Sequence, residues 1–238
     1  MRRTIGTILL GAALLLPATA AAGGGAATGE VRGRVRLRVE GVRLPDVGPI
    51  VVFLEGEAGN IPYEVPAHVP RVHQRNATFS PAFLVIAAGQ TVEMPNDDVI
   101  FHNVFSYSKP NRFDLGLYRK GTSRSVTLRY PGAVRIYCSI HESMNGIIFV
   151  APLPWFGVVR ATGDFTLTNV PAGRYRLRTW SEKLPEASRR VEVSAGESVL
   201  VNLEIGEGSG GTPDAKGHGR PVSRSPAPAA TRREVHRG

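Results

Sequence analysis

Three features are scarce in this sequence of 238 residues: cysteine, long apolar runs and helical periodicity. Cys138 is the only cysteine, which excludes a disulfide within the chain. The longest apolar run, residues 5–16, is too short to span a bilayer, and no other segment has the length. No segment of useful length after this run repeats its apolar residues at the period of a helix. These absences favour a soluble all-β protein with no stable membrane insertion.

The N-terminus has the pattern of a secretory signal peptide. Arg2 and Arg3 precede the short apolar run, and small residues follow it at 17–22. The pattern predicts a cleaved signal peptide over residues 1–22 and export to the periplasm or an equivalent compartment; an uncleaved N-terminal anchor is the alternative. Structural cysteines in such compartments are normally paired. The lone Cys138 is therefore a buried inert thiol, one half of an intermolecular disulfide, or a metal ligand.

The formal net charge of +9 does not by itself indicate a nucleic-acid partner. Part of that charge lies in the signal peptide and in residues 207–238, outside any predicted fold. Export, and the lack of interleaved aromatic and basic residues, argue against nucleic-acid binding. A basic face could still steer an acidic partner protein towards this one.

Apolar residues in the body of the chain follow the two-residue period of β-strands. Residues 31–39 alternate between apolar or small residues and charged ones, so one face of that strand should meet water. Further strands are predicted at 49–54, at 199–205 and, as a hairpin turning at 171–173, over 163–180. Short apolar runs between 71 and 150 are typical of a sandwich or barrel. Residues 207–238 are rich in Gly, Pro, Ser and Arg and predict a disordered tail.

Cys138 ends a predicted strand and is followed by side chains that bind soft metals. It is in phase with the inward apolar residues of that strand, and His141 and Met144 lie on the loop that follows. Thiolate, imidazole and thioether groups together suit copper above other metals. A blue-copper site needs a second imidazole. His102 can supply it, because the chain between it and Cys138 is long enough for a hairpin to bring the two together.

Two segments resemble the cupredoxins of the plastocyanin and amicyanin group. They are TFSPAFLVIAAGQTVEMPNDDVIFHNVFS at 78–106 and PGAVRIYCSIHESMNGIIFV at 131–150. The matching features are the F-x-P before a strand, the glycine before TVEMPNDD, the His-Asn pair and the closing C-x-x-H-x-x-M. With FDLGLYRKG at 113–121, the stretch is also similar to periplasmic plastocyanin-like proteins labelled methylamine-utilisation proteins. Ile140 stands where many members have proline, which concerns the stiffness of the loop and not ligation.

The resemblance implies a Greek-key β-sandwich over residues 70–152 that holds one type 1 copper ion. The ligands it implies are His102, Cys138, His141 and Met144. It also implies that Asn103 ties the two ligand segments together by a bond near Ser139.

The resemblance further implies where electrons enter and leave. They would pass through the exposed edge of His141, where a redox partner protein docks transiently. A ring of apolar residues including Met94, Phe101 and Ile140 would form the docking patch.

The flanks of this region predict a second small β-sandwich. ATGDFTLTNVPAGRYRLRTW at 161–180 resembles the second half of prealbumin-like or carboxypeptidase-regulatory modules, and the strands before residue 58 look like the missing beginning. We hypothesise that residues 30–58 and 153–206 form one discontinuous module, with the copper domain, residues 70–152, inserted in it. The alternative is that the N-terminal strands extend the cupredoxin sheet. The module shows no acid pair, activated nucleophile or phosphate-binding loop, so a docking or stabilising role is expected.

These features predict an exported protein that carries single electrons and is not an enzyme. Two other classes stay open. A copper storage or delivery protein would hold a more accessible metal that exchanges easily. A structural β-protein with a vestigial site would bind no copper tightly.

Overall fold

The computed structural model describes residues 27–57 and 61–206. The predicted all-β class is confirmed: these residues form sixteen strands and no α-helix, with one short 3-10 turn, η1 (Leu44–Val47). Nothing helical in this part of the chain is long and apolar enough to cross a membrane. The predicted signal peptide at 1–22 and the predicted disordered tail at 207–238 lie outside the described residues.

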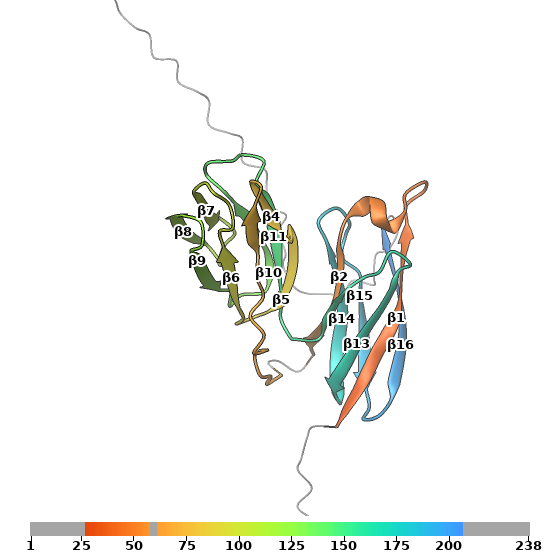
Figure 1. Cartoon of the computed structure of the whole chain (residues 1–238). Coiled ribbons are helices and arrows are strands. Elements are labelled where there is room, and N and C mark those ends of the chain that lie inside the picture. Colours follow the sequence, from red (N-terminus) through yellow and green to blue (C-terminus); the bar gives the residue numbers. More distant parts are fainter. Residues whose placement is uncertain (1–26, 58–60, 207–238) are drawn as a thin grey trace, which may run out of the picture.

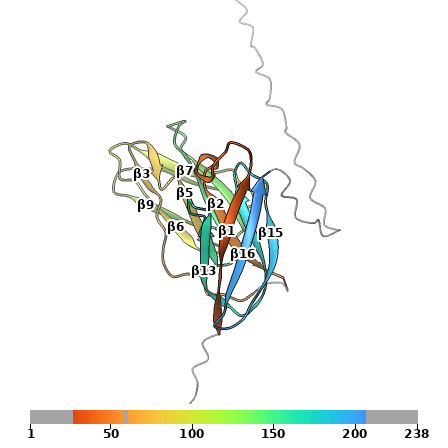
Figure 2. The same ribbon diagram turned by 90° about the vertical axis from the view of Figure 1, so that its right-hand side faces the viewer.

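Strands from both ends of the described chain build the first of two β-rich bodies, which we call the split module (residues 28–56 and 156–206). One sheet has the order β13-β1-β16, with bounds β1 (Thr28–Arg38), β13 (Asp164–Pro171) and β16 (Ser198–Gly206). The other has the order β12-β2-β14-β15, with bounds β2 (Ile50–Gly56), β12 (Phe156–Val158), β14 (Gly173–Ser181) and β15 (Ser188–Val193). β1 runs beside β16 in a parallel pair and is antiparallel to β13 (Figure 2). Residues near the start of the chain thus pair with residues about 130 to 170 positions later, as the separations of the Arg34–Asp164 and Arg34–Asn202 bonds show.

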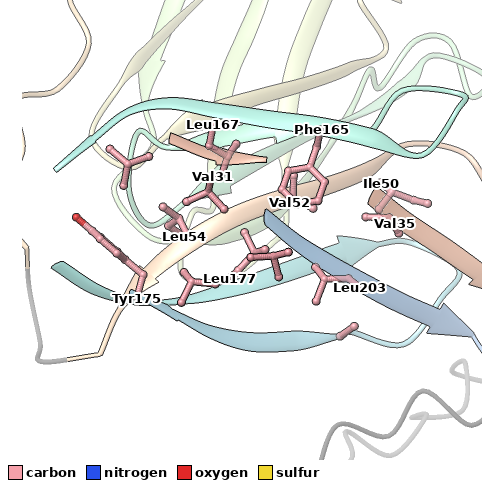
Figure 3. Packing of buried hydrophobic residues seen from close by; sticks show 14 of the residues in the cluster. Val31, Val35, Ile50, Val52, Leu54, Phe165, Leu167, Tyr175, Leu177 and Leu203 are labelled. Atoms are coloured by element: carbon pink, nitrogen blue, oxygen red, sulfur yellow. The ribbon is translucent and has the colours of Figure 1, made fainter. Parts of the chain in front are cut away.

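The alternating pattern of these strands explains how the two sheets pack. On β1, Val31 and Val35 are buried, whereas the arginines between and beside them are exposed. The arginine face is solvated and carries ion pairs such as Arg34 with Asp164. Inward side chains of both sheets meet in one core, drawn in Figure 3: Val31, Val35, Ile50, Val52, Leu54, Phe165, Leu167, Tyr175, Leu177 and Leu203.

The hairpin predicted over residues 163–180 is wrong. β13 and β14 lie in different sheets, β13 beside β1 and β14 between β2 and β15. The turn at Ala172 carries the chain from one sheet to the other, and the hydroxyl of Tyr175 donates to the carbonyl of Pro171 at 2.9 Å. A two-residue period records only that one face of a strand is buried. This period is the same in strands that pair within one sheet and in strands that face each other across a core.

Residues 73–151 form the second body, which we call the central domain; Figure 1 shows it beside the split module. Its main sheet has the order β5-β11-β10-β7-β8, with bounds β5 (Phe83–Ala87), β7 (His102–Ser106), β8 (Phe113–Tyr118), β10 (Gly132–Tyr137) and β11 (Asn145–Ala151). Two strand pairs complete it: β3 (His73–Arg75) with β4 (Thr78–Ser80), and β6 (Thr91–Pro95) with β9 (Ser123–Thr127). This domain has a core of its own, which includes Ile86, Val104, Ile136, Cys138 and Met144.

A third apolar cluster joins the two bodies. Trp180 of β14 stacks on Phe83 of β5, with ring centroids 5.9 Å apart, and on Phe149 of β11, at 4.8 Å. Phe53 of β2 packs against Phe149 at 5.3 Å. Because one sheet of the split module buries one face in its own core and presents the other to the central domain, the strand at 50–54 is buried on both faces, as its sequence predicts.

Candidate metal centre

Strand β10 brings Cys138 to the end of the central core. Ile136 is 1% exposed and Cys138 5%, so the inward phase predicted for this strand is observed. Cys138 follows directly after β10, whose last residue, Tyr137, pairs with Phe105 of β7. This pairing sets Cys138 beside the beginning of β7, where His102 lies.

The loop after Cys138 is folded back on itself by two backbone hydrogen bonds. The amide of Met144 donates to the carbonyl of His141 at 3.0 Å, and the amide of Cys138 donates to the carbonyl of Met144 at 3.2 Å. These bonds hold Cys138, His141 and Met144 in one compact turn. The Met144 side chain is 1% exposed and lies in the same apolar cluster as Cys138.

Three of the four predicted ligands turn their donor atoms towards one point. Cys138 Sγ lies 3.7 Å from Nδ1 of His102 and 3.9 Å from Nδ1 of His141. The three donor atoms all lie within 4.8 Å of one another. Bonds of about 2.0 Å to nitrogen and 2.3 Å to sulfur, at trigonal or tetrahedral angles, separate the two atoms by roughly 3.5–3.7 Å. The cluster therefore fits a bound metal, and with the Met144 thioether beside it the donor set is one that suits copper.

His102 is held from behind by a carboxylate. Its ring is fully buried, and Nε2 lies 2.8 Å from Oδ2 of Asp98. An ionised carboxylate only accepts hydrogen bonds, so Nε2 carries a proton; in the neutral ring the lone pair is then on Nδ1, the nitrogen nearest Cys138 Sγ. A histidine ring binds a metal through a nitrogen that carries no proton.

Asp98 is itself fixed by the turn between β3 and β4. The amide of Asn76 donates to Oδ1 at 2.8 Å and the amide of Ala77 to Oδ2 at 2.9 Å. Burial raises the pKa of Asp98, but the hydrogen bonds from Ala77, Asn76 and His102 together outweigh it and lower the pKa below its ordinary value. The carboxylate is therefore ionised at neutral pH.

The tie expected between the two ligand segments is present. Oδ1 of Asn103, next to His102, accepts from the amide of Ser139 at 2.8 Å and from its hydroxyl at 2.9 Å. Since Ser139 is next to Cys138, this side chain joins the start of β7 to the end of β10. Asn103 does not hold the His102 ring, which is held by Asp98.

Two of the three apolar residues predicted for the docking patch are exposed, and the third is buried. His141 is partly exposed. Phe101 and Ile140 are 56% and 51% exposed, and they precede His102 and His141 in the chain. Met94 is 0% exposed and packs in the central core, so its place in the docking patch is wrong. Alternation along β6 turns Val92 and Met94 to the same inward face.

Asp98 is the residue that reasoning from the sequence missed. The signal was present in the NDDVIFHN segment, where a carboxylate stands four positions before a candidate ligand. It was not decisive, because Asp97 precedes Asp98 and both are equally acidic. In the structure Asp97 pairs instead with His73, at 2.7 Å, and with Arg75.

Comparison with known proteins gives cupredoxins as structural neighbours. Neither a family model nor a curated protein matches the sequence. The purple cupredoxin from Nitrosopumilus maritimus is 24% identical over 34% of this chain and 99% of that chain, with a TM-score of 0.32. Amicyanin from Paracoccus versutus is 25% identical over 37% and 85% of the two chains, with a TM-score of 0.32.

A copper-containing nitrite reductase from Thermus scotoductus is 30% identical, with a TM-score of 0.34. That likeness covers 39% of this chain and 26% of the reductase, so this chain spans about a quarter of that enzyme. The neighbours agree with the predicted resemblance at the level of cupredoxins. With TM-scores this low, the functional conclusion rests on the residues of the site.

Proposed function

We propose that this protein is an exported type 1 copper protein that carries single electrons between redox partners. The observation that carries the proposal is the convergence of Cys138 Sγ with Nδ1 of His102 and His141 at 3.7 and 3.9 Å, with Met144 buried in the same apolar cluster as Cys138. Copper, when bound, supplies a one-electron couple. The residues supply a fixed set of nitrogen and sulfur donors that changes little between two oxidation states.

The burial of the ligands favours electron transfer over copper storage or delivery. His102, Cys138 and Met144 are 0%, 5% and 1% exposed, so of the four side chains only the partly exposed His141 lies open to a chelator or a second protein. With Met144 as the fourth donor, the proposed site would leave no position for a substrate. On this basis the protein is not an enzyme, and it uses the partly exposed His141 edge as the point of electron exchange.

The surface at that edge suits a transient protein partner. Val99 and Ile100, which precede Phe101 in the same loop, are also exposed, at 82% and 44%. Small apolar patches that are exposed on a monomer often mark sites of interaction. We propose that the redox partner docks on this patch, defined as Val99, Ile100, Phe101 and Ile140, with His141 at its centre.

We also propose that the central domain is an insertion in the split module. β1 pairs with β13 and β16, and β2 with β12 and β14, so strands before residue 57 are completed by strands after residue 155. The two bodies have separate cores. These pairings support residues 30–58 plus 153–206 as one domain and 70–152 as the other. Export is proposed from the signal peptide pattern at residues 1–22 alone.

The colour of the copper-loaded protein tests the proposed function. The full exported chain should take up one Cu(II) and show the intense absorption of a thiolate-to-copper transition, which reversible one-electron reduction should bleach. Cys138→Ser should abolish the colour, because the chromophore is the copper–thiolate bond, whereas Ser143→Ala, on the exposed part of the same loop, should keep it. A colourless wild type without stoichiometric copper would refute the proposal. A coloured protein that loses its copper rapidly to a chelator would instead point to delivery.

A further inference from the structure

The turn between β3 and β4 has an unusual backbone. Its two central residues, Asn76 and Ala77, both have φ of 52°, as a two-residue type I′ hairpin turn requires. Glycine is the residue that adopts this conformation without strain, yet alanine occupies the second position. The turn points two successive amides at one carboxylate, that of Asp98, at 2.8 and 2.9 Å.

Asp98 connects this turn to the metal centre. Its Oδ2 takes one hydrogen bond from Ala77 and one from Nε2 of His102, at 2.9 and 2.8 Å. The side chain of Asp98 is only 13% exposed, and its own amide donates to Oδ1 of Asn96 at 2.9 Å. The carboxylate is thus held by the turn and by His102, and the backbone of Asp98 is held by Asn96.

The two candidate imidazole ligands differ in the hydrogen bonding of their outer ring nitrogens. His102 has a carboxylate on its outer nitrogen, whereas within residues 27–57 and 61–206 no hydrogen bond to the outer nitrogen of His141 is found. The site therefore combines one ligand that is held by the fold with one that is partly exposed and held only by its loop.

We propose that Asp98, clamped by the amides of Asn76 and Ala77, is a positioning residue that sets the tautomer and the donor strength of His102. The proposal rests on the proposed copper function. A carboxylate on the outer nitrogen keeps the proton on Nε2 and makes Nδ1 a stronger donor. A stronger donor stabilises Cu(II) more than Cu(I), so the clamp lowers the midpoint potential. Through Asp98 the β3–β4 hairpin influences the metal centre, although none of its residues is a candidate ligand.

The test compares Asp98→Asn with a neighbouring control. Asp97→Asn removes an equally acidic side chain that bonds His73 and Arg75 instead of His102. Loss of a carboxylate behind a metal-binding histidine weakens metal binding by about 10- to 100-fold. If the Cu(II) to Cu(I) affinity ratio falls about tenfold, the midpoint potential of Asp98→Asn rises by about 59 mV. The control should keep the wild-type potential.

A second measurement needs no copper and no variant. Nitrogen-15 NMR of the histidine rings in the copper-free wild type should show His102 protonated at Nε2, with slow exchange of the Asn76 and Ala77 amides. A His102 ring protonated at Nδ1, or a potential equal in Asp98→Asn and wild type, overturns the inference. Failure of the wild type to bind copper refutes the proposed function separately, because the ring tautomer of the copper-free protein still shows whether the clamp exists.

Discussion

Replacing Trp180 with alanine should destabilise the protein without changing its metal centre. The indole lies between Phe83 and Phe149 at the junction of the two bodies, with centroid distances of 5.9 and 4.8 Å. Truncation of a buried tryptophan costs about 3–5 kcal/mol. Because Trp180 is only partly buried, we take the lower end, about 3 kcal/mol. In a protein of this size each kcal/mol lowers the melting temperature by about 2–4 °C, so a fall of about 6–12 °C is expected.

Denaturant unfolding followed by fluorescence measures the loss of stability, and the copper absorption shows whether the metal centre is unchanged. Leu200→Ala is the matched control, since Leu200 is apolar but 70% exposed on β16, and an exposed truncation changes stability by no more than about 0.5 kcal/mol. The copper absorption of Trp180→Ala should equal that of wild type in native conditions. A loss below about 1 kcal/mol would show that the aromatic stack does not hold the two bodies together. A changed absorption spectrum would show that the junction and the ligands are coupled.

Two further outcomes concern the metal. Met144→Gln should retain copper and lower the midpoint potential, because the Met144 thioether would be a weak ligand that tunes the potential of the copper; voltammetry that finds the wild-type value would mean that Met144 is not a ligand. Removing copper should lower the melting temperature, since binding at 100 times the dissociation constant stabilises the folded state by about 2.7 kcal/mol; equal melting curves with and without copper would contradict a site built into the fold.

Local patterns in the sequence were enough to predict the strand phases and the grouping of the ligands. Cys138 falls on the inward face of β10 because the two-residue period of the strand continues to its end. His141 and Met144 then need only one tight turn to come near it. The distance from Cys138 to His102 depends on which strands pair. The period of the side chains does not show this pairing, and the resemblance to cupredoxins was needed to predict it.

Two of the errors share a physical origin. The predicted hairpin at 163–180 and the missed role of Asp98 depend on contacts between segments that are distant in the sequence, whereas the alternation along β6 already places Met94 on the inward face. Asp98 and its turn are more than twenty positions apart, with separations of 22 for Asn76 and 21 for Ala77. Side-chain period and residue type show which face is buried, but not which neighbour it meets.

In the proposed function, the contacts that join the two bodies differ from the residues that would exchange electrons. The split module is attached through Phe149 and Phe83 and through the ion pair of Arg135 with Glu182, whereas the candidate ligands Cys138 and His102 lie at the end of β10 and the start of β7. Phe149 stands four residues along β11 from Asn145, the partner of Tyr137, which is about 13 Å of strand. Cys138, which follows Tyr137, thus lies at an end of the central domain that the aromatic junction does not reach. In the proposed function, the split module would stiffen the sheet that carries Cys138 and leave the edge of His141 open to a partner.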